Sequence, residues 1–322
     1  MPEPIRCFKS YDVRGRVPDE LNEDIATRIG RAYAQVIEPG TVVVGHDIRL
    51  TSESMKAALV EGLLAQGVDV FDIGQCGTEE IYFATSHLKV GGGICVTASH
   101  NPKDYNGMKF VRAESKPISG DSGLKEIQSQ AERNDFSPAA QRGTLHVVDV
   151  SEAYIAHLLS YIDLKALKPL KIVCTAGNGG AGPVVDLLEP HLPFEFIKLH
   201  HEADGHFPNG VPNPMLEENR VASADLVRET GEIWVSPGTA TLTAASSTTT
   251  RVPLLRVTIL WAYWPRRFWL NRLRRLWSTT RVSPGIPWIL HRYPVAQPSK
   301  VKRGTRSSRK PCAASMRSMA EK

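Results

Sequence analysis

Short apolar runs alternate with helix signals through the first 110 residues, and this alternation limits the fold more than any other feature of the chain. Strands are expected at residues 41–45, 68–74 and 93–97, each rich in β-branched or apolar side chains. Ser52 can cap a helix between the first two strands, whose buried face repeats every four residues, and Thr78 opens another. Strands joined by helices pair in parallel through right-handed crossovers. The pattern therefore predicts a doubly wound α/β domain.

A tight polar loop follows the third expected strand. Ligands of open α/β sheets bind beyond the carboxyl ends of the strands, and Ser99 lies at that position. Pro102 restrains Asn101 to extended geometry, and Asn106-Gly107 is expected to form a tight turn. We therefore expect a rigid loop that presents the Ser99 hydroxyl outward.

The chain divides into three regions. A polar stretch at 112–142 is expected to form a surface helix and loop that close a complete first domain, residues 1–150. Residues 151–232 begin a second α/β unit of the same kind, with a helix from Ser151, expected strands at 170–174 and 194–199, and a glycine-rich turn at 177–182. No Gly-Lys-Ser/Thr follows that turn, which argues against a nucleotide-binding loop.

Residues 233–322 differ in composition from everything before them. They contain 17 Lys and Arg, one acidic residue (Glu321) and all six tryptophans, which leaves 22 basic and 33 acidic residues in 1–232. The net charge of +5 describes neither part, so it does not indicate nucleic-acid binding. This basic region lacks the pattern of helices and strands, and we expect it to be disordered or poorly packed.

Neither a secretory signal nor a membrane span is indicated by the sequence. The N-terminus lacks an apolar core, and no run of about 18 apolar residues is present. The five cysteines are scattered without a paired metal-ligand spacing, and Cys95 and Cys174 lie in expected strands. A reducing cytoplasm is the expected location, with no nucleic-acid or membrane partner.

Four segments together resemble the α-D-phosphohexomutase superfamily, which includes bacterial phosphomannomutases and phosphoglucomutases. They occur in the family's order along the chain. The segments are Phe8-Lys9-Ser10-Tyr11-Asp12-Val13-Arg14-Gly15, Val44-Gly45-His46-Asp47-Ile48-Arg49-Leu50-Thr51-Ser52, Thr97-Ala98-Ser99-His100-Asn101-Pro102 and Gly205-His206-Phe207-Pro208-Asn209-Gly210-Val211-Pro212-Asn213-Pro214-Met215.

The resemblance implies an isomerase that moves a phosphoryl group within a hexose phosphate. Ser99 would be the phosphoserine, with His100 beside it, Lys109 as cationic and proton-transfer support, and Arg14 gripping phosphate. Asp47 and Arg49 are expected to be structural ion-pair partners, and the segment 205–215 a structural loop near the site. The implied reaction interconverts mannose 6-phosphate and mannose 1-phosphate through a bisphosphorylated sugar, for GDP-mannose and cell-surface polysaccharide synthesis. Phosphoglucomutase activity is the alternative, and neither sugar-binding residues nor an oligomeric state are assigned.

The resemblance also implies Mg²⁺, held in the family by the carboxylates of an Asp-Gly-Asp-x-Asp-Arg motif against the phosphoserine. That motif is absent after residue 232, so Ser99, through its phosphate, is the one metal ligand expected here. Read in the neighbouring frame, codons for residues 234–250 permit MGIAWHGDLDRCFLYDD, which contains a GDLDR metal loop. We interpret residues from about 231 onward as out-of-frame translation, and expect this chain to be inactive or nearly so. A non-catalytic remnant whose basic tail binds anionic surfaces is a further alternative.

Overall fold

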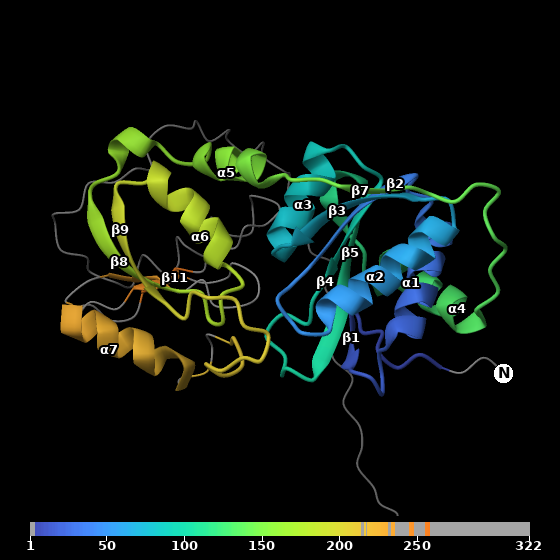
Figure 1. Ribbon diagram of the computed structural model, residues 1–322, viewed down its shortest axis with the longest axis horizontal. Helices are drawn as coiled ribbons and strands as arrows, with labels where there is room; N and C mark the ends of the chain where they lie inside the picture. The colour runs from blue at the N-terminus through green and yellow to red at the C-terminus, as the bar shows by residue number, and fades with distance from the viewer. Residues whose placement is uncertain are drawn as a thin grey trace, which may run out of the picture. The chain divides into compact units, whose positions relative to one another are not determined.

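The computed structural model describes residues 4–213, 216, 218–230, 233–235, 245–247 and 255–257. Its first sheet has the strand order β1-β5-β4-β2-β3-β7, with β6 paired to β5 (Figure 1). The strands are β1 Val13–Arg16, β2 Thr41–His46, β3 Asp69–Gln75, β4 Gly92–Val96, β5 Tyr105–Arg112, β6 Lys116–Pro117 and β7 Leu145–Val147. The pairs β4-β2, β2-β3 and β3-β7 are parallel, as the alternation predicts. By contrast, β5 runs antiparallel to both β4 and β1.

Helices cover both faces of this sheet. They are α1 Glu23–Ile37, α2 Ser52–Ala65, α3 Thr78–His87 and α4 Lys125–Arg133. Successive side chains of β2 point to opposite faces of the sheet. Val42 and Val44 pack into one core with α1, α2 and α4, whereas Val43 packs into a second core with α3. The predicted doubly wound α/β layering is therefore confirmed for this domain (Figure 1).

Two helix starts differ in detail from the sequence prediction. Ser52 is the first residue of α2 rather than its cap, and its hydroxyl is used elsewhere, on Asp47. Helix α1 was not predicted, although it has a clear start: the Asn22 side chain accepts a hydrogen bond from the backbone N–H of Ile25 at 3.0 Å. Glu23 and Asp24 follow in its first turn, where the helix dipole favours acidic groups.

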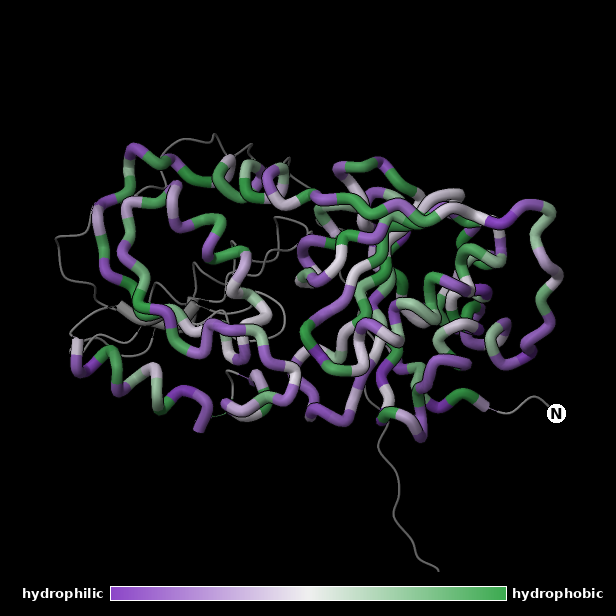
Figure 2. Tube along the Cα trace, in the orientation of Figure 1, coloured by the Kyte–Doolittle hydropathy of each residue, from purple (hydrophilic) through white to green (hydrophobic). Residues whose placement is uncertain are grey.

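A second, smaller parallel sheet has the order β10-β8-β9. Its elements are α5 Ser151–Leu159, β8 Leu170–Thr175, α6 Gly182–Leu188, β9 Phe194–Leu199, α7 Val221–Thr230 and β10 Ile233–Val235. Helix α7 alternates hydrophilic and hydrophobic residues (Figure 2), and it buries Ser223 and Val227. This is the second α/β unit that the sequence predicts.

Three short strands fall in the region predicted to be disordered or poorly packed. Strand β10 pairs with β8, while β11 Ala245–Ser247 and β12 Leu255–Val257 pair antiparallel with each other. The rest of that prediction concerns residues outside the described ones. Among the described helices, none is long and apolar enough to cross a bilayer.

Candidate active site

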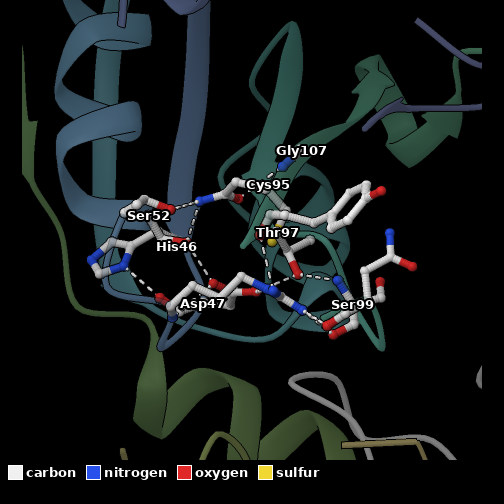
Figure 3. A network of polar contacts seen from close by, with 12 residues as sticks. His46, Asp47, Ser52, Cys95, Thr97, Ser99 and Gly107 are labelled. Atoms are coloured by element: carbon white, nitrogen blue, oxygen red, sulfur yellow. Dashed lines mark hydrogen bonds and ion pairs between the residues drawn. The ribbon is translucent and has the colours of Figure 1, made fainter. Parts of the chain in front are cut away.

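The carboxylate of Asp47 joins three elements of the first domain at one point. It follows β2 directly, and its side chain is 1% exposed. Oδ2 accepts a hydrogen bond from the Thr97 hydroxyl at 2.6 Å, and Oδ1 accepts from the Ser52 hydroxyl at 2.5 Å and from the Arg49 backbone N–H at 3.0 Å (Figure 3). The ends of β2 and β4 and the start of α2 are therefore tied together by one buried group.

Arg49 holds the serine loop by its backbone. Its Nη1 donates to the carbonyl oxygens of Pro102 at 2.6 Å and Tyr105 at 2.9 Å. Its Nη2 donates to those of Ser99 at 2.9 Å and Asn101 at 2.7 Å. Burial lowers the pKa of Arg49, which the Asp47 carboxylate opposes at 3.3 Å. A guanidinium stays charged even so, and its planar array of donors suits several carbonyls at once.

Ser99 itself is held in an uncommon conformation. Its φ of 50° lies in the left-handed region, and its backbone N–H donates to the Thr97 hydroxyl at 2.9 Å. We expected the loop to present the serine outward, but Ser99 is only 7% exposed. The expectation was wrong in this respect because the contacts with Thr97 and Arg49 draw the loop down onto the sheet.

The predicted turn at Asn106-Gly107 is also corrected. Both residues lie inside β5, where Asn106 is fully buried and donates to the hydroxyls of Thr51 at 2.9 Å and Ser52 at 3.0 Å. A side chain at Gly107 would place its Cβ 2.1 Å from the carbonyl oxygen of Val13. The glycine is therefore needed for the close approach of β1, and the turn propensity of the dipeptide is overridden by strand pairing.

Two predicted cations lie side by side near the serine loop. Strand β1 pairs with β5 so that Arg14 of β1 is opposite Gly107 of β5. Lys109 lies two residues after Gly107 in β5. Asp12 Oδ2 accepts from Arg14 Nη2 at 2.6 Å and lies 3.4 Å from Lys109 Nζ. The side chains of Arg14 and Lys109 are 24% and 28% exposed, which leaves both cations accessible to an anion.

Burial and the nearby cations change the pKa of His100. Its pKa is lowered first by burial and then by the positive charges of Arg14, Lys109 and Arg49, with Asp12 acting in the opposite direction. The lowered pKa favours the neutral form of the imidazole. A dianionic phosphoryl group placed among these cations would be attracted, and it would raise the pKa of His100.

One acidic residue that was not predicted from the sequence completes the arrangement. Asp12 bridges Arg14 and Lys109, and its position two residues before Arg14 in an extended segment was the available signal. Asp47 and Arg49 do form the expected ion pair. The carbonyls that Arg49 holds come from residues 50 or more positions away, which no local pattern reveals.

The second-domain segment 205–215 was expected to be a structural loop near the site. Asn178, in the glycine-rich turn, fixes it: its Nδ2 donates to the carbonyl of Gly210 at 2.9 Å, and its Oδ1 accepts from the N–H of Asn209 at 3.1 Å. Phe207 of this loop lies against the guanidinium of Arg49, with 5.0 Å between Cζ and the ring centroid. The loop therefore contacts the group that holds the serine loop.

The residues around Ser99 include few groups that could hold a metal ion. Within the part of the chain that the structure describes, no three His, Cys, Asp or Glu side chains gather closely enough to hold a metal ion. The described residues therefore do not form the carboxylate metal site that the resemblance implies.

Comparison with family models gives two matches. The model described as phosphoglucomutase/phosphomannomutase, alpha/beta/alpha domain I, matches residues 6–138, and the corresponding domain II model matches residues 152–241. The two matched ranges contain every predicted site residue.

Individual relatives agree with these matches. A phosphomannomutase of Escherichia coli is 58% identical over 233 residues, covering 70% of this chain and 51% of that protein. A protein of Xanthomonas campestris pv. campestris called phosphohexose mutases is 57% identical over 227 residues, with the same coverage. The crystal structure of a phosphoglucomutase/phosphomannomutase family protein from Burkholderia thailandensis superposes with a TM-score of 0.67 at 32% identity, covering 77% of this chain and 55% of that one. The chain spans about half the length of the curated relatives it matches.

Proposed function

The chain belongs to the phosphoglucomutase/phosphomannomutase family, and from that premise we propose that its first 232 residues supply the phosphoserine half of a phosphomannomutase. The substrate pair is mannose 6-phosphate and mannose 1-phosphate. The observation that supports this most is the rigid Ser99 loop beside Arg14 and Lys109, which gives a hydroxyl, a fixed backbone and a cationic anion site in one place.

Phospho-Ser99 is the phosphoryl donor in the proposed reaction. A hydroxyl oxygen of the hexose phosphate attacks phosphorus, the bond from phosphorus to Ser99 Oγ breaks, and the proton of the sugar hydroxyl is passed to the serine oxygen. The resulting bisphosphorylated sugar turns over in the site and returns its other phosphate to Ser99. The first transfer moves one proton from the sugar hydroxyl to Ser99 Oγ, and the return transfer moves one proton back to the sugar. No oxidant or co-reactant is consumed.

The residues around Ser99 have separate roles in this proposal. Arg14 and Lys109 stabilise the charge on the transferring phosphoryl group, which is the main requirement of this chemistry. Lys109 and His100 are the groups available to relay the proton. Asp12 keeps the two cations together when no phosphate is present.

We further propose that this chain alone turns over hexose phosphate very slowly. Mg²⁺ is the cofactor that the family resemblance implies, and the Asp-Gly-Asp-x-Asp-Arg motif is not found between residues 233 and 322. A metal Lewis acid contributes several kcal/mol to such a transfer, which corresponds to about a thousandfold in rate. Ser99, through its phosphate, remains the proposed metal ligand on this chain.

The test compares this chain with a protein in which the reading frame is restored near codon 231. We expect the restored protein to interconvert the two mannose phosphates and the 322-residue chain to be at least about a thousandfold slower. Sequencing the gene around that codon should reveal an intact neighbouring frame encoding the GDLDR loop. A restored protein without mutase activity would refute the proposed function, and equal rates would refute the frame interpretation.

Glucose phosphates are the second candidate substrates, because the family includes phosphoglucomutases. The names of the E. coli relative and of similar relatives favour mannose. Assaying both sugars with the restored protein decides between them. The four cysteines that lie in the described part of the chain are buried and free, which supports the proposed cytoplasmic location.

A further inference from the structure

A loop of the second domain packs on the residue that holds the serine loop, and the reaction scheme above gives it no role. The loop spans residues 204–210, between β9 and the following segment. Its centre is Phe207, which is 7% exposed and lies with its ring 5.0 Å from the Arg49 guanidinium carbon. A cation and the face of an aromatic ring attract each other, most strongly where water is excluded.

The approach of this loop is close along its backbone as well. A Cβ added to Gly205 would lie 2.4 Å from the carbonyl oxygen of Ile48 and 3.0 Å from the backbone nitrogen of Leu50. These two residues flank Arg49 in the sequence. Any side chain at Gly205 would therefore push the loop away from the segment that carries Arg49.

The other side of the loop is anchored to its own domain. Asn178 is 1% exposed, and its backbone and side chain make three hydrogen bonds with the loop, to Asp204, Asn209 and Gly210, at 2.9 to 3.1 Å. Phe207 has a φ of 56°, a left-handed conformation that is rare for a bulky residue. Such strained residues persist only where surrounding contacts fix them, and they gather at functional sites.

We propose that Phe207 is a positioning residue for the phosphoserine loop, acting through Arg49. The ring excludes water from one face of the guanidinium and fixes its plane, so that its donors stay on the carbonyls of Ser99, Asn101, Pro102 and Tyr105. The second domain thereby determines how rigidly Ser99 is presented. The inference rests on the proposed phosphoryl-carrying role of Ser99.

The experiment uses the 322-residue chain with Phe207→Leu, and Phe207→Trp as the conservative variant that keeps an aromatic face. Phe136→Leu is the matched control, because the Phe136 ring lies 5.8 Å from the Arg31 guanidinium carbon, away from the serine loop. Hydrogen exchange is measured on the backbone amides of Ser99, Asn101 and Tyr105, each of which donates a hydrogen bond within the serine loop. We expect exchange to rise about tenfold in Phe207→Leu and to stay at the parental rate in Phe207→Trp and Phe136→Leu.

A second readout separates positioning from a general loss of stability. The pKa of His100 is depressed partly by Arg49, so a loosened loop should let it rise toward its ordinary value in Phe207→Leu and leave it unchanged in Phe136→Leu. Arg49→Lys provides the same test if Phe207→Leu does not fold, since lysine keeps the charge but cannot hold four carbonyls. It should loosen the loop although the Phe207 ring is intact.

The outcomes are distinct. Loop exchange in Phe207→Leu that stays parental, or that rises equally in Phe136→Leu, would overturn the inference. Labelling of Ser99 by a hexose 1,6-bisphosphate is followed in the frame-restored protein, and it should slow about tenfold in Phe207→Leu, in step with exchange. A frame-restored protein that takes no label on Ser99 counts against the proposed function, and the exchange and titration results then still decide the positioning role.

Discussion

Two clusters in this chain each pair an aspartate with basic side chains, one cluster being buried and the other exposed. The Asp47 and Arg49 side chains are each 1% exposed, and their hydrogen bonds hold the serine loop, the end of β4 and the start of α2. Asp186 is 51% exposed and accepts from Lys198 at 2.7 Å and from His201 at 2.8 Å, on the second domain. Both clusters have short contacts, so distance does not distinguish them.

Burial determines what each cluster can do. Exposed pairs gain little because water screens them and their side chains lose freedom. A buried charge without a partner is strongly unfavourable, so the first cluster fixes the backbone that carries Ser99, whereas the second adds little beyond local solubility and charge. The buried cluster is therefore the one that can hold the serine loop in a conformation with a left-handed serine.

The largest expected effect comes from breaking the buried cluster. Asp47→Asn removes the charge opposite Arg49 and should lower the free energy of unfolding by about 3–5 kcal/mol. Asp186→Asn, the same change in the exposed cluster, should lower it by about 1 kcal/mol or less. Urea unfolding of both variants measures the difference, and equal losses would show that burial does not separate the clusters.

A smaller loss of stability is expected where β1 pairs closely with β5. Gly107→Ala places a methyl group 2.1 Å from the Val13 carbonyl and should cost about 1–3 kcal/mol through strand displacement. Gly120→Ala is the control, since its nearest neighbour would lie at 3.4 Å, at the end of the flexible Lys125 side chain. Thermal unfolding compares the two, and a neutral Gly107→Ala would contradict the packing described here.

The smallest effect is a difference between two histidines. The pKa of His100 is lowered by burial and by neighbouring cations, whereas that of His200 is lowered by burial alone. High salt should therefore raise the pKa of His100 but leave that of His200 nearly unchanged. NMR titration of the ring protons measures both pKa values. Equal changes with salt would show that the neighbouring cations do not lower the pKa of His100.

The same lowered pKa gives a signed effect of pH on stability. Between the folded pKa of His100 and its ordinary value of about 6.5, the unfolded chain binds more protons, so stability rises with pH across that window. His100→Gln should flatten this part of the profile. The measurement is the urea midpoint between pH 5 and 7, and an unchanged slope would contradict the assignment.

Local patterns were sufficient for the parallel strands but not for the site's geometry. The expected strand at 41–45 is β2, because a short β-branched run buried on both faces has few other solutions. Asn106-Gly107 was misassigned because its turn propensity is local, while its strand partners in β1 and its hydrogen-bond partners Thr51 and Ser52 are distant in sequence. The segments around Ser99 and Arg14 could be found from their residues. That Arg49 holds Ser99, and that Phe207 covers Arg49, depends on tertiary contacts that no spacing encodes.

The central claim is that the buried cluster presents Ser99 as the phosphoryl carrier. Its most direct test is to incubate the frame-restored protein with mannose 1,6-bisphosphate, digest it and locate phosphate by mass spectrometry. We expect one phosphate per chain, on Ser99, and none in Ser99→Ala. Phosphate on another residue, or mannose phosphate turnover that persists in Ser99→Ala, would contradict it.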